Sequence, residues 1–233
     1  MRNDRGPRSM DLFVDEAGGV QDPLAQTYSP NIQILAPGAI LLRGLASEVA
    51  VTLWTDLQAV LEEAPLRHMT TPGGFQMSVS MSNCGSLGWI SQSTGYLYSR
   101  TDPANGRLWP DMPASFKTLA LDAAARAGFD GFVPDACLIN HYEPGARLSL
   151  HQDRDERDFK HPIVSVSLGL PATFVFGGAK RNDPAARVAV AHGDVVVWGG
   201  PSRLRFHGVL TLKHGHHPMT GRSRFNLTLR GAG

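Results

Sequence analysis

Cysteine is almost absent from this sequence, since only Cys84 and Cys137 occur in 233 residues. Two cysteines are too few for a disulfide-built scaffold, and we expect both to be reduced thiols. An excess of charge of one sign is also missing, because 22 Lys and Arg face 21 Asp and Glu. Attraction of the whole molecule to nucleic acid is therefore excluded as a sufficient basis for binding, although a local basic patch is not.

Long hydrophobic runs are missing as well. Gly, Pro or a charged residue interrupts every apolar stretch before the roughly 18 residues that a membrane span requires. The opening sequence MRNDRGPRSM mixes acidic and basic side chains and has no apolar signal region. We therefore expect a cytoplasmic monomer without membrane association. Residues 1–30 have no clear hydrophobic period, and we interpret them as an N-terminal arm.

The apolar residues that are present suffice for one large core. Hydrophobic residues make up 42% of the chain and charged residues 18%, and a chain of this length can bury roughly 70–75% of its unfolded surface. Apolar residues at helical spacing predict a helix over residues 47–64, with Ser47 as its N-cap. A second helix is predicted over residues 116–124 and ends at Gly128.

Beyond Gly128 the hydrophobic period changes from 3.6 to 2, which is typical of strands. Short strands separated by Gly and Pro turns predict helices first and then an antiparallel sandwich of jelly-roll type. Residues 66–112, rich in Gly, Ser, Met and aromatics, are interpreted as short hairpins and loops without a core of their own. The predicted strands are Ala136–Asn140, Arg147–Gln152, Ile163–Leu170, Thr173–Phe176, Arg187–Ala191, Val195–Trp198, Leu204–Gly208 and Arg224–Arg230.

The strand Arg224–Arg230 has the most informative alternation. Its Phe and Leu residues share one face, and its Arg, Asn and Thr residues share the other. An ordinary half-solvated strand would show the same pattern. Alternatively, Arg224 and Arg230 together grip a ligand with two carboxylates, because the planar guanidinium binds a carboxylate through two hydrogen bonds.

His151 and Asp153 form a His-x-acid triplet on another predicted strand. The similar triplets at His141 and His192 lie beside turns, where hydrogen bonds to the backbone are expected. Side chains at i and i+2 project to the same side of a strand, so this pair can bind one metal if the strand bends at Asp153. His207, on a later strand, would complete a set of three ligands. Three ligands on one face suit non-haem Fe(II), whereas structural zinc takes four; the spacing alone leaves this choice open.

Longer motifs surround these residues. They are TPGG (71–74), NCG (83–85), GYLY (95–98), DACLIN (135–140), LSLHQD (148–153), IVSVSLGLP (163–171), KRNDP (180–184), HGDVVVWGG (192–200) and RFNLTLR (224–230). Together they resemble the AlkB-type Fe(II)/2-oxoglutarate-dependent dioxygenases, over nearly the whole chain from about Asp11 to Gly231.

The resemblance implies an iron centre and a site for a dicarboxylate. In that family the iron ligands match His151, Asp153 and His207. 2-Oxoglutarate would chelate the iron through its keto-acid end, with Arg230 holding its distal carboxylate and Arg224 helping at the other end. The hydrogen bonds around it would be completed by Asn140, Tyr142 and Asn226. With O₂ as the second co-substrate, decarboxylation to succinate would drive hydroxylation of the N-alkyl carbon of a damaged base, which then releases an aldehyde.

Residues 66–112 resemble the nucleotide-recognition lid of the family, where a base that has left its stack is bound. Trp89 matches the residue that stacks on the base, although a core aromatic that anchors a hairpin is the alternative. Tyr96 and Thr71 match backbone and phosphate contacts, and Met81 lines the lid, where a flexible thioether suits bases of differing shape.

Two further residues match contacts to the damaged base. Asp155 matches a carboxylate that attracts positively charged alkylated bases, but it also lies in a charge run, and such runs are usually solvated. Arg181 matches a residue that reaches the base pocket, although an ordinary turn arginine fits as well. The sequence departs from the family pattern at Phe75, Arg147 and Arg154, which puts base preference and phosphate contacts in doubt.

The predicted fold class is α+β: a double-stranded β-helix, or jelly roll, with N-terminal helices packed on it and a nucleotide-recognition lid. Residues 31–233 are predicted to be a single catalytic domain, with the lid at 66–112 and the jelly-roll core at 133–233. The cluster His214, His216 and His217 resembles a metal site, but we interpret it as a solvated loop.

Several functions stay open on the sequence alone. The first is a DNA-repair demethylase acting mainly on alkylated single-stranded DNA, with lesions of the 1-methyladenine and 3-methylcytosine type. Double-stranded DNA or RNA could be the substrate of the same chemistry, because the sequence offers no clear reader of the 2′-hydroxyl group. A non-catalytic jelly-roll protein that binds metal or nucleic acid is a further alternative, as is an oxygenase for a protein or small metabolite.

Overall fold

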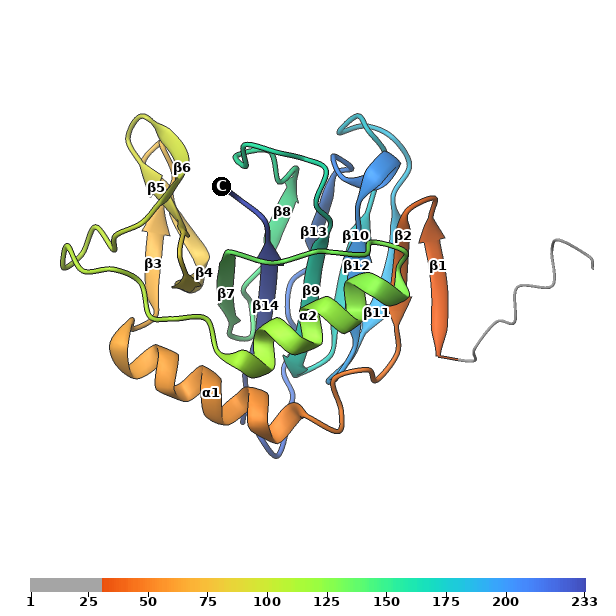
Figure 1. Ribbon diagram of the computed structural model, residues 1–233, viewed down its shortest axis with the longest axis horizontal. Helices are drawn as coiled ribbons and strands as arrows, with labels where there is room; N and C mark the ends of the chain where they lie inside the picture. Colours follow the sequence, from red (N-terminus) through yellow and green to blue (C-terminus); the bar gives the residue numbers. More distant parts are fainter. Residues whose placement is uncertain (1–30) are drawn as a thin grey trace, which may run out of the picture.

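The computed structural model describes residues 31–233, so the predicted N-terminal arm lies outside the described residues. Two antiparallel sheets make up most of the fold (Figure 1). The larger sheet has eight strands in the order β1 (Ile32–Ala36), β2 (Ala39–Leu42), β12 (Val195–Trp198), β9 (Ile163–Gly169), β14 (Arg224–Arg230), β7 (Ala136–Tyr142), β4 (Gln76–Gly85) and β3 (Arg67–Thr70). The smaller has four, in the order β11 (Ala186–Val190), β10 (Ala172–Phe176), β13 (His207–Val209) and β8 (Leu148–His151).

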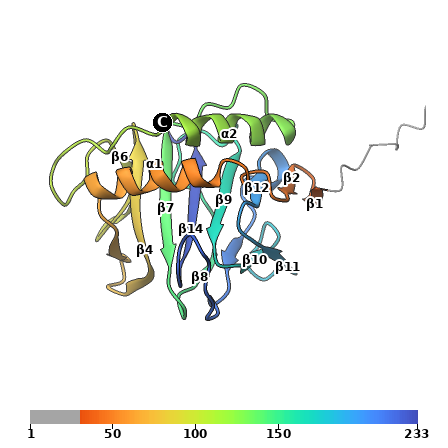
Figure 2. The ribbon, with the colours of Figure 1, turned by 90° about the horizontal axis from the view of Figure 1, so that it is seen from below.

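The helices α1 (Ala50–Glu63) and α2 (Ala114–Arg126) lie on one side of the larger sheet (Figure 2). Their apolar stripes form one core with the sheet residues Leu227 and Leu229, which are fully buried. The predicted stripes are therefore confirmed. Ser47 is not the N-cap, because the chain first makes a tight backbone turn at Gly44–Ser47 and the helix begins only after Val49.

A second core fills the space between the two sheets. Its largest side chains include Tyr142 and Trp198 from the larger sheet and Phe174 and Phe176 from the smaller one, all buried. Two facing antiparallel sheets around one core confirm the predicted jelly-roll sandwich. All seven residues of β14 are buried, so the alternative of a half-solvated strand is wrong.

The larger sheet takes strands from well before residue 133, which corrects two predictions. The hairpin of β1 and β2 precedes α1 and pairs through β2 with β12, so the order is not helices first. The ten-residue strand β4 pairs with β7 in the same sheet, so residues 66–112 are more than short hairpins and loops. The strand is buried from Val79 to Cys84, with Val79 and Met81 on one face and the small hydroxyl side chains of Ser80 and Ser82 on the other.

A separate two-stranded sheet stands at the β3–β4 end of the molecule (Figure 1). It consists of β5 (Gly88–Gln92) and β6 (Gly95–Ser99). We call this pair the β5–β6 hairpin. Ile90 of this hairpin forms a small buried cluster with Trp109 and with Ala64, which follows α1 and lies outside residues 66–112.

The strand predicted at Leu204–Gly208 begins instead at His207. A 3-10 helix, Gly200–Ser202, precedes it, and the turn continues through a hydrogen bond from the amide of Arg205 to the carbonyl of Ser202. Gly208 then allows a close approach between strands, because a Cβ atom there would lie 2.6 Å from the carbonyl oxygen of Leu148 on β8. Among residues 31–233, neither helix has the length and apolarity needed to cross a membrane.

Candidate active site

A cavity of about 990 Å³ is lined by both sheets and by the β5–β6 hairpin. Every site residue predicted from the sequence contributes to its wall, although their individual roles remain predictions. These residues are Thr71, Met81, Trp89, Tyr96, Asn140, Tyr142, His151, Asp153, Asp155, Arg181, His207, Arg224, Asn226 and Arg230.

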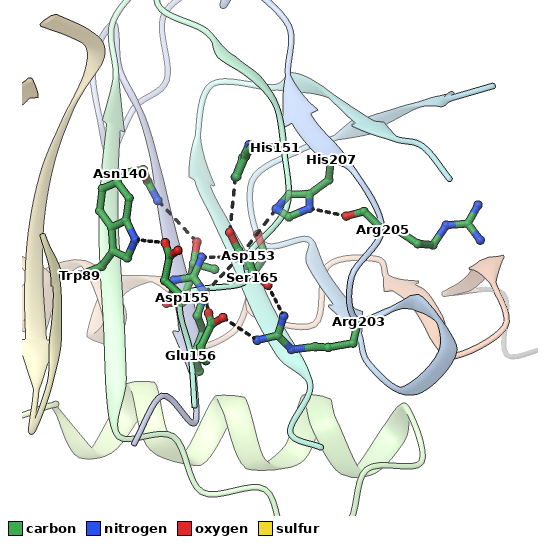
Figure 3. Close-up of polar contacts among 12 residues, drawn as sticks. Trp89, Asn140, His151, Asp153, Asp155, Glu156, Ser165, Arg203, Arg205 and His207 are labelled. Carbon is green, nitrogen blue, oxygen red and sulfur yellow. Dashed lines mark hydrogen bonds and ion pairs between the residues drawn. The ribbon is translucent and has the colours of Figure 1, made fainter. Parts of the chain in front are cut away.

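Two histidines and one aspartate meet at the centre of this cavity (Figure 3). Pairing of β8 with β13 puts His151 opposite His207, with ring centroids 4.4 Å apart. Asp153 follows just beyond the end of β8, and its carboxylate oxygens lie 3.5 Å from Nε2 of His151 and 3.7 Å from Nε2 of His207. All three ligand atoms fall within 4.8 Å of one another, and in residues 31–233 no other group of three such side chains does so.

The outer nitrogens of both rings are fixed by backbone carbonyls. Nδ1 of His151 lies 2.8 Å from the carbonyl of Ser149, and Nδ1 of His207 lies 3.1 Å from the carbonyl of Arg205. Because a carbonyl can only accept a hydrogen bond, each Nδ1 carries the proton and each Nε2 turns its lone pair inward. This arrangement is what a divalent metal requires of imidazole ligands.

Burial and charge set the protonation of the three groups. Burial and the neighbouring His151 lower the pKa of His207 to about 4, so its ring is neutral. Burial opposes ionisation of Asp153, but the charge of Arg230, the adjacent ring of His207 and the hydrogen bond to His151 outweigh it and hold the pKa well below the usual range. For His151, burial is outweighed by the hydrogen bond and charge of Asp153, which raise its pKa. With Nε2 of His151 deprotonated, the site offers one carboxylate and two imidazoles, a donor set that fits Fe(II).

Arg230 lies beside the metal-binding triad, whereas the resemblance predicts that it holds a distal carboxylate. Its guanidinium contacts Oδ2 of Asp153 at 2.5 Å and Oε1 of Glu156 at 3.2 Å. Both partners are anions, and their charge overcomes the effect of burial and raises the pKa of Arg230. The side chain is therefore already paired with two acids, and which end of the ligand it faces stays a prediction.

Arg224 is buried, and two of its three guanidinium nitrogens lack a hydrogen-bond partner among residues 31–233. Its Nη2 donates to Oγ of Ser167 at 3.1 Å, and its guanidinium carbon lies 4.9 Å from the ring centroid of Tyr142. Its Nε and Nη1 have no hydrogen-bond partner among residues 31–233, and neither does Oδ1 of Asn140. Burial lowers the pKa of Arg224, with Tyr142 offsetting part of this effect. An unpaired cation in the cavity wall fits an anionic ligand such as a carboxylate.

Comparison with known proteins agrees with this donor set. A family model described as the 2OG-Fe(II) oxygenase superfamily matches residues 38–230. The alpha-ketoglutarate-dependent dioxygenase AlkB of Escherichia coli is 54% identical over 224 residues, which cover 96% of this chain and 98% of that protein. The AlkB of Salmonella typhimurium is 52% identical over 223 residues, with the same coverage. This chain is an AlkB-type 2OG-Fe(II) oxygenase.

A solved structure supports the assignment. The structure of OsALKBH1 matches with a TM-score of 0.76 and 29% sequence identity, covering 85% of this chain and 99% of that one. Enzymes of this family are dioxygenases that use Fe(II), 2-oxoglutarate and O₂. In this AlkB-type chain, His151, Asp153 and His207 would hold the iron, and the free donors of Arg224 are suited to 2-oxoglutarate.

The amide of Asn226 is committed to the sheet of the AlkB-type fold. Its Nδ2 donates to Oγ of Ser165 and to the carbonyl of Val166, while its Oδ1 accepts from the hydroxyl of Thr228. Asn226 therefore stiffens the cavity floor, and only its carbonyl oxygen has remaining capacity for a ligand.

The opposite wall is aromatic and carries an acid. The rings of Trp89 and Tyr96 stack with centroids 5.0 Å apart and an angle of 20° between planes. Nε1 of Trp89 donates to Oδ2 of Asp155 at 2.8 Å, which leaves the other carboxylate oxygen available (Figure 3). Asp155 is thus partly buried and paired, not simply solvated. The guanidinium of Arg181 lies 5.4 Å from the ring centroid of Phe206 at the cavity wall.

Two lid residues have structural partners as well. Oγ1 of Thr71 accepts the amide hydrogen of Phe75 in the turn between β3 and β4, and Met81 is buried in the core between the sheets. Phe75 is 76% exposed and lines the cavity mouth together with Arg147 and Arg154.

Three residues of the cavity wall or its support were not predicted as functional: Tyr98, Glu156 and Arg203. Tyr98 stands in the GYLY motif, so its sequence signal was present. Glu156 belongs to a charge run that usually indicates a solvated surface, yet its side chain is only 1% exposed. Arg203 lies just before the strand predicted at Leu204–Gly208, and its side chain is buried.

Proposed function

We propose that this AlkB-type enzyme is an oxidative demethylase that repairs N-alkylated bases, mainly in single-stranded DNA. Lesions of the 1-methyladenine and 3-methylcytosine type fit best, because they carry positive charge. One observation carries the proposal: a single cavity joins the metal-binding triad to a stacked Trp89–Tyr96 wall with the acid Asp155 beside it. An aromatic wall with an adjacent carboxylate suits a flat, cationic base that has left its stack.

Each part of the chain has a separate task in this reaction. When bound, Fe(II) with 2-oxoglutarate and O₂ supplies the oxidation of the alkyl C–H bond. Asp153 would hold the metal through a carboxylate oxygen, and His151 and His207 through Nε2. Arg224 would orient the dicarboxylate through its two free donors, and these unpaired donors support the proposal that it binds the distal carboxylate.

The base-facing residues would select and place the substrate. The Trp89–Tyr96 wall offers a stacking surface, and the free oxygen of Asp155 favours a cation over a neutral base. Exposed Arg147 and Arg154 at the cavity mouth would contact phosphates, which makes binding weaker as salt rises. We further propose that the enzyme acts as a cytoplasmic monomer.

The test is a mass-spectrometric assay of iron-loaded protein with 2-oxoglutarate, O₂ and an oligonucleotide that contains one 3-methylcytosine. We expect loss of one methyl group for each succinate and formaldehyde formed, faster with single-stranded DNA than with a duplex. The same sequence as RNA runs in parallel, and faster repair of RNA would favour an RNA-directed enzyme. Succinate formation that never depends on the oligonucleotide would contradict the proposal.

A further inference from the structure

A buried acid, Glu156, lies directly behind the metal-binding triad. Its side chain is 1% exposed, and its two oxygens face two arginines: Arg203 at 3.2 Å and Arg230 at 3.2 Å. The side chains of Arg203 and Arg230 are themselves nearly inaccessible, at 3% and 6% exposure. A buried carboxylate between two buried cations is held in one place, because moving it would leave charges unpaired in a poorly solvated interior.

Both arginines also hold Asp153. Arg230 contacts the carboxylate of Asp153 at 2.5 Å, and Nη1 of Arg203 donates to its backbone carbonyl at 2.8 Å (Figure 3). Asp153 lies beyond the end of β8, where ladder hydrogen bonds no longer fix the backbone. Its position as a ligand therefore depends on these two arginines. Glu156 pairs with both, and the carbonyls of His161 and Thr228 each accept one further hydrogen bond from them.

Charge gives Glu156 a second effect on the metal site. The cation of Arg230 touches Oδ2 of Asp153 and competes with a metal ion for the electrons of that carboxylate. The negative charge of Glu156 on the same guanidinium offsets part of this competition. Without Glu156, the full charge of Arg230 would act on Asp153, and the aspartate would become a weaker ligand.

The same acid is joined to the nucleotide-facing wall. The hydroxyl of Tyr98 donates to Oε1 of Glu156 at 3.0 Å. Tyr98 belongs to β6, two residues after Tyr96, which stacks on Trp89. A displacement of the β5–β6 hairpin by a bound base would thus reach Asp153 through Tyr98, Glu156 and the arginines.

We propose that Glu156 is a positioning residue that holds Arg203 and Arg230 on the metal ligand Asp153 and, through Tyr98, links the β5–β6 hairpin to the metal site. The positioning of Arg203 and Arg230 by Glu156 rests only on the contacts of these residues with one another and with Asp153. The link to the hairpin rests on the proposed function, because it requires a nucleic-acid base at that wall.

The first experiment measures Co(II) affinity of the purified full chain, without substrate and without turnover, from the visible absorption of the bound ion. Glu156→Gln keeps the shape and removes the charge, and we expect its affinity to fall about 10- to 100-fold, as for other residues that support metal ligands. Asp158→Asn is the matched control, since it removes one acid nearby whose side chain is 41% exposed. Wild-type affinity in Glu156→Gln would overturn the positioning role.

The second experiment follows the Co(II) spectrum as a single-stranded oligonucleotide with one 3-methylcytosine is added. Tyr98→Phe removes only the hydroxyl that donates to Glu156, so it stays informative even if Glu156→Gln fails to fold. We expect wild-type metal affinity in Tyr98→Phe, but a spectral response to the oligonucleotide that is at least halved. A full wild-type response would overturn the link. If wild-type protein itself shows no response, the proposed substrate fails, while the positioning role is still decided by the metal affinities.

Discussion

Arg224 gives the sharpest test of how the cavity holds 2-oxoglutarate. Its Nε and Nη1 are buried and unpaired among residues 31–233, so they are available to a carboxylate. A hydrogen bond to a charged group contributes about 1.5–3 kcal/mol. Two such bonds are therefore worth about 3 kcal/mol at the lower limit, and we expect Arg224→Met to weaken 2-oxoglutarate binding by about 100-fold or more.

The same variant has an unusual expected effect on the ligand-free protein. Leaving a buried donor unpaired costs about 1–3 kcal/mol, and the contact with the ring of Tyr142 returns only part of that. Replacing Arg224 by Met removes both effects, so the free energy of unfolding should stay equal or rise. Arg230→Met is the matched comparison: it strips a partner from Asp153 and Glu156 and should destabilise by about 3–5 kcal/mol.

Thermal unfolding with and without ligand measures both effects. With Mn(II) in place of iron and 2-oxoglutarate at about 100 times the wild-type dissociation constant, the wild-type protein gains about 2.7 kcal/mol. A 100-fold weaker variant gains only about 0.4 kcal/mol under the same conditions. If Arg224→Met binds 2-oxoglutarate as wild type does, or if its ligand-free form unfolds as readily as Arg230→Met, the assignment of Arg224 is refuted.

Three further predictions concern the triad, the aromatic wall and a histidine of the larger sheet. His151→Ala should abolish Mn(II) binding and succinate formation, and full turnover would remove this ring from the ligand set. Trp89→Ala should weaken binding of a methylated oligonucleotide at least 10-fold in fluorescence anisotropy with unchanged Mn(II) affinity; loss of the fold would instead support a purely structural tryptophan. Burial and the nearby His68 lower the pKa of His141, only partly offset by Glu143, so its neutral form is favoured in the folded state. The stabilisation that depends on neutral His141 should therefore be complete above about pH 6.5, the pKa of the unfolded state, and decrease as the pH falls below that value. In urea unfolding, the free energy of unfolding of His141→Gln should fall less between about pH 7.5 and 5.5 than that of the wild-type protein. An equal decrease in both proteins would contradict this.

Regular alternation of apolar and polar residues made many of the strands predictable. Arg224–Arg230 alternates without interruption, and its observed bounds equal the predicted ones. The hairpin β1–β2 was missed because a Pro-Gly turn divides its short apolar run. Strand β4 was missed because its buried polar face consists of serines, which are as common in loops as in strands.

The sequence could predict which residues form the candidate site, but not how they are arranged in space. Spacing placed His151 and Asp153 near each other, but their meeting with His207 depends on the register between β8 and β13, which no local pattern contains. The two arginines of β14 were predicted to clamp one ligand. The proposed exchange of their ends rests on Asp153 and Glu156, which lie far away in sequence and pair with Arg230.

The central claim is that one metal and one 2-oxoglutarate share this cavity, and an anaerobic crystal structure with Mn(II) and 2-oxoglutarate tests it most directly. We predict manganese bound by His151, Asp153 and His207, with the distal carboxylate of 2-oxoglutarate on Nε and Nη1 of Arg224. A metal bound elsewhere, or a distal carboxylate on Arg230, would contradict the account.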